Sequence, residues 1–129
     1  MFRDPQINLY VADVDASRRF YGELFGFTET FRTPPDGEPI HVEMRLGTLT
    51  LGVASIESAR RIHGLDLGDG PPRGELVLWT DDVDEAFQSI TAQGGRPLSE
   101  PHDFLADLRA AWIADPDNNP VQMVMRRAK

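Results

Sequence analysis

The two halves of this chain repeat one another, and this repeat restricts the possible fold more than any other feature. At an offset of 69 residues the matching pairs are Leu9 with Leu78, Asp13 with Asp82, Val14 with Val83, Asp15 with Asp84 and Gly26 with Gly95. Self-similarity at a fixed offset is the sequence signature of a repeated structural unit. We therefore interpret the chain as an internal duplication of one module.

The first module opens with a strand and a helix. Residues 7–11 alternate apolar and polar side chains, which predicts a strand with one buried face and a polar face that carries Gln6, Asn8 and Tyr10. Asp13 stands at the position of an N-cap, apolar residues follow at helical spacing, and Gly26 stands where a helix end favours positive φ. In the second module, residues 76–80 and the stretch after Asp82 repeat this order.

Residues 40–53 predict a hairpin around a two-residue Gly-Thr turn of type II′ at 47–48. This turn sets the register, so that the apolar side chains share one face and His41, Glu43 and Arg45 share the other. In this register Glu43 lies opposite Gly52. One face of the hairpin is thus predicted to be core, and the other a polar wall.

The remaining segments carry weaker signals. Residues 28–39 and 55–74 show no periodic pattern and are interpreted as loops, with one helical turn near 56–62. Residues 108–114 and 121–125 are expected to be the last two strands, and residues 101–105 a loop before them. We predict one α+β domain with module 1 at about 1–54, a linker at 55–74 and module 2 at about 75–129.

Charge and composition exclude several classes of function. The sequence has 13 basic and 21 acidic residues, for a net charge of -8, which disfavours nucleic acids and anionic membranes as partners. The absence of cysteine excludes disulfides, thiolate zinc sites and cysteine nucleophiles. No apolar run has the length of a membrane span or the form of a signal peptide, so we expect a cytoplasmic protein. There is no nucleophile elbow and no phosphate-binding glycine loop.

Four motifs resemble one known family. They are residues 8–21 (NLYVADVDASRRFY), 24–27 (LFGF), 80–84 (TDDVD) and 115–120 (DPDNNP). With the duplication, they make the chain similar to the vicinal oxygen chelate superfamily, the group of glyoxalases, bleomycin-resistance proteins and extradiol dioxygenases. The resemblance implies two tandem βαβββ modules that form a curled, cup-shaped mixed sheet with helices outside. It also implies a homodimer, because small members of the family pair in this way.

The resemblance further identifies four positions at which metal-binding members carry ligands. Here these positions hold Gln6, Gly52, Glu75 and Gln122. Divalent metals prefer carboxylates and imidazoles, so one carboxylate, two amides and a glycine are a poor set, and we expect no metal cofactor. The alternative is a divalent metal held by Gln6, Glu75 and Gln122, with Glu43 supplying a further carboxylate.

Aromatic side chains suggest the kind of ligand. Strand parity places Trp79 on the same face as Glu75, and the resemblance places Trp112 inside the cup. Two tryptophans that face a cavity would form a platform for a flat ligand, and Phe104 in the 101–105 loop would contact it from the rim. The alternative is that these side chains fill the core between helix and sheet.

Glu75 also has two interpretations. In a partly enclosed cup without metal it is a candidate general base, and it is the one catalytic residue that we predict. The alternative is a structural ion pair with Arg45 or Arg109.

Three functions therefore remain open. The first is a metal-free binding protein of the bleomycin-resistance type that sequesters an aromatic ligand or antibiotic. The second is a lyase, isomerase or dioxygenase that works through a metal or through Glu75. The third is a structural or regulatory protein that only retains the fold. For the first, the predicted ligand-binding residues are Gln6, Asn8, Tyr10, His41, Glu43, Arg45, Trp79, Phe104, Trp112 and Gln122.

Overall fold

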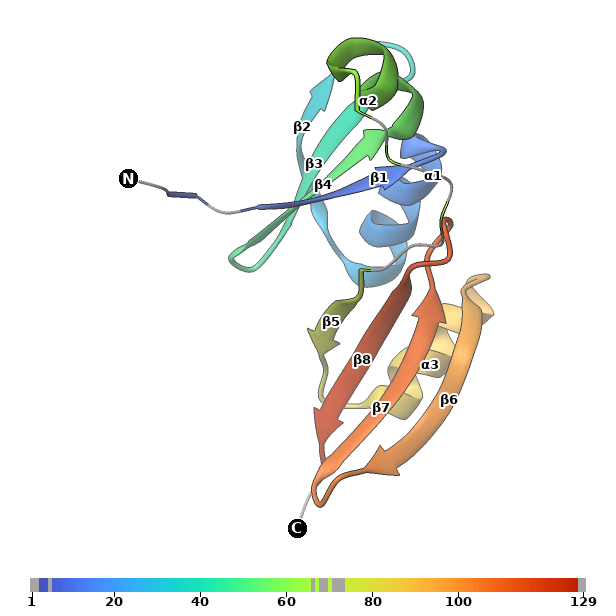
Figure 1. Cartoon of the computed structure of the whole chain (residues 1–129). Helices are drawn as coiled ribbons and strands as arrows, with labels where there is room; N and C mark the ends of the chain where they lie inside the picture. Colours follow the sequence, from blue (N-terminus) through green and yellow to red (C-terminus); the bar gives the residue numbers. More distant parts are fainter. Residues whose placement is uncertain (1–2, 5, 66, 68–69, 71–73, 128–129) are drawn as a thin grey trace. The chain divides into compact units, whose positions relative to one another are not determined.

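The computed structural model describes residues 3–4, 6–65, 67, 70 and 74–127, and it divides into two compact units, Met1–Gly70 and Pro71–Lys129 (Figure 1). The first unit contains β1 (Ile7–Val11), α1 (Val14–Arg19), a π-helical turn (Phe20–Leu24), β2 (Thr28–Thr33), β3 (His41–Leu46), β4 (Leu49–Ser55) and α2 (Ile56–His63). The second contains β5 (Leu76–Trp79), α3 (Val83–Ala92), β6 (Arg96–Phe104), β7 (Leu108–Ala114) and β8 (Pro120–Arg126).

Each unit holds one four-stranded mixed sheet. The strand orders are β1-β4-β3-β2 and β5-β8-β7-β6, with the first two strands of each order parallel and the other neighbours antiparallel. Both units therefore have the order βαβββ, which confirms the α+β class and the two tandem modules.

The repeated aspartates begin the repeated helices. Asp13 accepts a hydrogen bond from the backbone N–H of Ala16 at 3.0 Å, and Asp82 accepts one from Glu85 at 3.0 Å. Each carboxylate satisfies a backbone donor that the first helical turn leaves without a partner. Gly26 follows with a φ of 79°, as the sequence predicts for a helix end.

The core of each unit lies between its sheet and its helix. In the first unit, the predicted hairpin register is confirmed: Val42 lies opposite Val53, and Met44 opposite Leu51. All four of these side chains are buried. In the second unit, the corresponding face buries Ala111, Ile113, Val121 and Met123. The opposite face of each sheet, which we call its open face, keeps the polar and aromatic side chains.

The interpretation of residues 28–39 as a loop is wrong for Thr28–Thr33, which form β2. A bulge between Glu29 and Phe31 breaks the alternation of the strand. Glu29 and Arg32 are ion-paired at 2.9 Å, so charged side chains stand where apolar ones would mark the strand. This edge strand therefore has no hydrophobic period.

The interpretation of residues 101–105 as a loop is also wrong, because β6 continues to Phe104. Pro97 and Pro101 weaken the strand signal, yet β6 is an edge strand, where proline is tolerated. Register shifts interrupt its pairing with β7 at two places. The helical turn expected near 56–62 is confirmed as α2, and no helix within the described residues is long and apolar enough to cross a membrane.

Candidate functional site

The open face of the first sheet brings together most of the polar residues that were predicted from its strands. Asn8 and Tyr10 come from β1, and His41, Glu43 and Arg45 come from β3. Their side chains share one face because each is two residues from the next along its strand and because Gly52 of β4 lies opposite both Asn8 and Glu43.

Gly52 makes room for the side chain of Asn8. A Cβ atom at position 52 would overlap Asn8 Oδ1 and would lie 3.3 Å from Cε1 of His41. Gln6 Nε2 donates a hydrogen bond of 2.9 Å to the same Asn8 oxygen. The carboxamide of Asn8 therefore lies over the glycine and beside the imidazole of His41.

His41 and Glu43 form a half-buried pair. His41 Nε2 lies 3.2 Å from Glu43 Oε2, and the two side chains are 22% and 29% exposed. The ring of Phe31 lies 6.2 Å from the imidazole, centroid to centroid. An ionisable pair on a partly apolar face of this kind is suited to binding or proton transfer.

Beside this pair lies a cavity of about 300 Å³ between the open face of the first sheet and α2, which we call the α2 cavity. It is lined by Asn8, Tyr10, Thr33, Ile40, His41, Ala54, Ser55, Ser58, Ala59, Ile62 and His63. The surface of its wall is mainly apolar, although seven of the eleven lining side chains carry a polar group. A mainly apolar wall with placed polar groups is usual for a small-molecule site.

The contribution of α2 to this cavity was not predicted from the sequence. Residues 55–74 were interpreted as a linker with one helical turn near 56–62. Yet Ser55, Ser58, Ala59, Ile62 and His63, which all line the cavity, follow the helical spacing i, i+3, i+4, i+7, i+8. This spacing is the signal that would have identified the face.

The open face of the second sheet carries both tryptophans. Val77, Gln122 and Trp112 are paired directly across β5, β8 and β7, and directly paired residues share a face. Trp79 lies two residues beyond Val77, so it shares that face. Its side chain is 60% exposed and lies 5.3 Å from the guanidinium of Arg126, so the alternative that Trp79 fills the core is wrong.

Trp112 lies at the centre of a polar and aromatic cluster on that face. Its indole Nε1 donates a hydrogen bond of 2.8 Å to Glu75 Oε1, and its ring stacks on His102 with centroids 5.7 Å apart. The ring of Phe104 lies 6.5 Å from that of His102. Phe104 thus belongs to the open face as a strand residue rather than a loop residue.

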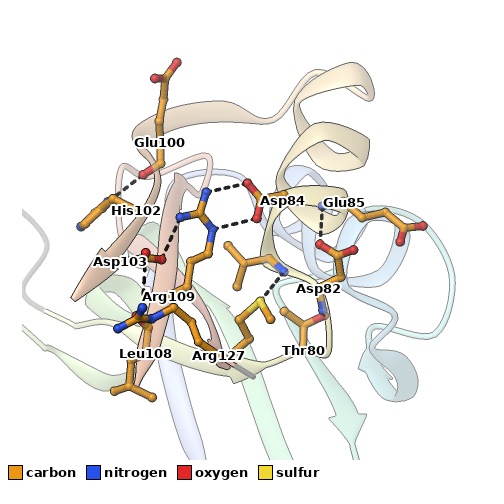
Figure 2. A network of polar contacts seen from close by, with 12 residues as sticks. Thr80, Asp82, Asp84, Glu85, Glu100, His102, Asp103, Leu108, Arg109 and Arg127 are labelled. Carbon is orange, nitrogen blue, oxygen red and sulfur yellow. Dashed lines mark hydrogen bonds and ion pairs between the residues drawn. The ribbon is translucent and has the colours of Figure 1, made fainter. Parts of the chain in front are cut away.

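Two arginines were considered as ion-pair partners for Glu75, and each has other contacts within its own unit. Arg45 donates to the carbonyl of Gly47 at 3.3 Å. Arg109 lies on the α3 side of its sheet and binds Asp84 at 2.8 Å and Asp103 at 2.9 Å (Figure 2). The alternative of an ion pair between Glu75 and Arg109 is therefore wrong. The pair with Arg45, which belongs to the other unit, stays an alternative.

The contacts of Arg109 tie the first turn of α3 to β6 and β7. The hydrogen bond from Arg109 lowers the pKa of Asp84, and the two carboxylates raise the pKa of the guanidinium further above its usual range. Arg127 adds a contact of 3.5 Å to Asp103. This network, drawn in Figure 2, stabilises the second unit and does not line the open face.

The residues at the family's metal positions do not fit a resident metal. In the first unit, Gln6 offers a neutral amide already bonded to Asn8, and Gly52 offers no side chain. In the second, Glu75 accepts the indole N–H of Trp112, and Gln122 is a second neutral amide. In the described parts of the chain, no three His, Asp or Glu side chains are grouped so that they could hold a metal ion. Divalent metals favour carboxylate or imidazole ligands, which this donor set largely lacks.

A family model for the Glyoxalase/Bleomycin resistance protein/Dioxygenase superfamily matches residues 5–123, so the chain belongs to this superfamily. The chain is also 31% identical over 109 residues to the anthracycline biosynthesis protein DnrV of Streptomyces peucetius. That match covers 81% of this chain and 40% of the relative, so the chain spans well under half of the relative's length.

Solved structures share the fold at low sequence identity. A family enzyme from Burkholderia phytofirmans PsJN has a TM-score of 0.80 and 20% identity, with 97% of this chain and 99% of that chain covered. TioX from Micromonospora sp. ML1 has a TM-score of 0.74 and 21% identity, with 94% and 97% covered. At this level of identity the likeness shows the fold alone.

Proposed function

We propose that this protein binds a planar aromatic small molecule in the α2 cavity, without a metal. The observation that carries the proposal is the cavity itself. Its volume of about 300 Å³ and its mainly apolar wall surface, into which polar side chains project from the sheet and from α2, suit a small-molecule site. Asn8, His41 and His63 supply polar groups that can orient a ligand.

Two further observations support an aromatic ligand. The rings of Tyr10 and His41 line the cavity, and offset or edge contacts between rings contribute about 0.5–1.5 kcal/mol beyond burial of area. The relative from Streptomyces peucetius is named for the biosynthesis of anthracyclines, which are planar polycyclic aromatics. A flat ring system is therefore the ligand class that we favour.

The other predicted ligand residues stay part of the proposal. Gln6 is bonded to Asn8 and Glu43 to His41 beside the cavity, and Arg45 lies further along β3 on the first open face. Trp79, Phe104, Trp112 and Gln122 lie on the second open face. An enzymatic role with Glu75 as general base has less support, because Glu75 is exposed and its carboxylate accepts the Trp112 indole. We therefore favour sequestration of the ligand, which the resemblance to bleomycin-resistance proteins implies, over its enzymatic conversion.

The homodimer also stays a proposal, and it rests on the family resemblance. Sedimentation velocity at micromolar concentration should give a single species with twice the mass of the 14.4 kDa chain. A species with the mass of one chain over that concentration range would contradict it.

The experiment for binding uses 2-methoxyanthraquinone, a planar tricyclic probe that cannot ionise. We expect saturable binding by equilibrium dialysis. Ile62 lines the cavity, so Ile62→Lys should weaken binding at least about tenfold by placing an unpaired charge against an apolar ligand. Leu65→Lys is the matched control, because Leu65 is an exposed apolar residue outside the lining. No saturable binding, or equal binding by Ile62→Lys, would overturn the proposal.

A further inference from the structure

We propose that His41, paired with Glu43, accepts the proton of an acidic hydroxyl on the aromatic ligand, so that the α2 cavity binds a phenol as its phenolate. This inference rests on the proposed function and deepens it. It names the chemical class of the ligand, a hydroxylated aromatic, and the residue that recognises its hydroxyl.

The geometry of the pair determines which nitrogen accepts the proton. Glu43 Oε2 lies 3.2 Å from His41 Nε2, and an ionised carboxylate can only accept a hydrogen bond. In a neutral imidazole the proton therefore sits on Nε2, and Nδ1 carries the lone pair that can accept another. When the ligand transfers its proton, its O–H bond breaks, an N–H bond forms on Nδ1, and the oxygen keeps the electron pair.

Both products of the proton transfer, the imidazolium and the phenolate, have a neighbouring group that stabilises them. The imidazolium that forms lies against the Glu43 carboxylate, and both side chains are half-buried, so their attraction is screened less than at a fully exposed surface. Asn8 lines the same cavity beside His41, and its oxygen is already bonded to Gln6. Its NH₂ group is a neutral donor suited to the phenolate oxygen.

The surrounding elements add few competing charges. Besides His41, the titratable groups that line the cavity are Tyr10 of β1 and His63 of α2. From β2 and β4 the cavity takes Thr33, Ala54 and Ser55, which carry no charge. Arg45 follows on the same strand face, but it is exposed and its Nε donates to the carbonyl of Gly47. Glu43 is thus the charged group that contacts the imidazole.

The test compares 2-hydroxyanthraquinone with 2-methoxyanthraquinone, which has the same rings and no acidic proton. Ionisation of the bound phenol is followed by the shift of its absorbance to longer wavelength across a pH titration. In the wild-type protein, we expect the pKa of the bound phenol to fall by about one unit or more relative to the free probe. A fall of one unit corresponds to a tenfold preference for the phenolate of about 1.4 kcal/mol.

Two substitutions test whether His41 and Glu43 cause this shift in the pKa of the bound phenol. His41→Gln should abolish it, and Glu43→Gln, which keeps a hydrogen-bonding partner for His41 and removes the charge, should reduce it by at least about half. The pKa of the bound phenol is measured with each variant saturated with the hydroxy probe, so that a change in affinity does not enter the comparison. If His41→Gln does not fold, as judged by circular dichroism, Glu43→Gln carries the test alone.

The outcomes separate this inference from the proposed function. Saturable binding of the methoxy probe with an unchanged or raised pKa of the bound phenol overturns the proton transfer and leaves aromatic binding in place. A shift that persists in both variants also overturns it. Failure of both probes to bind overturns the inference together with the proposed function.

Discussion

Replacement of Gly52 by alanine tests the close approach of Asn8 on the open face of the first sheet. The new methyl group would overlap Asn8 Oδ1 and would lie 3.0 Å from its Cγ and 3.3 Å from Cε1 of His41. Asn8 must then rotate away, which breaks its hydrogen bond with Gln6. We expect the fold to survive, because the group that moves is an exposed side chain rather than the backbone.

Two opposing contributions set the magnitude. Alanine in a strand interior is favoured over glycine by about 0.5–1 kcal/mol, because it loses less backbone entropy on folding. The lost hydrogen bond between Gln6 and Asn8 lies at the low end of the usual contribution of about 0.5–1.5 kcal/mol, because both side chains are exposed. Gly52→Ala alone should therefore change the free energy of unfolding by less than about 1 kcal/mol.

A double-mutant cycle isolates the contact. In an Asn8→Ala background the overlap is absent, so Gly52→Ala should stabilise the protein by about 0.5–1 kcal/mol. Urea unfolding followed by circular dichroism should give a coupling energy of about 0.5–1.5 kcal/mol between the two positions. A coupling below about 0.3 kcal/mol would refute the reasoning, because it would mean that Asn8 does not occupy the space over Gly52.

Three other substitutions test the second unit. The pKa of Asp84 is lowered by Arg109, so this carboxylate stabilises the fold above its unfolded-state pKa and loses that contribution as the pH falls. Asp84→Asn should therefore show a smaller drop in Tm than wild type as the pH falls from about 5 towards 1, and an equal drop would contradict this. Gly95→Ala should destabilise by about 1–3 kcal/mol in urea unfolding, because its Cβ would lie 2.8 Å from the carbonyl oxygen of Ile90; a neutral effect would contradict that contact. Trp79→Ala should change the free energy of unfolding by less than about 1 kcal/mol, since the side chain is exposed. It should weaken binding of 2-methoxyanthraquinone several-fold if the second open face takes part in binding. A large loss of stability would show that the indole is packed.

Several features of the fold follow from local sequence signals. The repeat at an offset of 69 residues predicted two modules, and the caps at Asp13 and Asp82 are formed as expected. The hairpin register was predicted pair by pair, because a two-residue turn at Gly47 leaves one way to align the strands on either side. The helix caps and the hairpin depend on interactions between residues that are close in the chain.

Two edge strands, β2 and the end of β6, were missed because neighbouring residues compensate for a weak local pattern. In β2, the ion pair of Glu29 with Arg32 replaces the apolar side chains that would mark a buried face. In β6, Pro97 and Pro101 are tolerated because one side of the strand has no neighbour within its sheet. Only the pairing of these segments with β3 and β7 makes them strands.

The candidate site also has one part that the sequence predicts and one part that only the structure shows. Strand parity placed Asn8, Tyr10, His41 and Glu43 on one polar face, and the structure has them there. The α2 cavity needs in addition α2 to lie beside residues from all four strands of the unit, and no periodic pattern shows which face of a sheet a helix will cover. The sequence alone therefore determined which side chains share a face, because that follows from the two-residue period of a strand. Tertiary packing decided which of them line a cavity, because a cavity depends on contacts between segments that are distant in the chain.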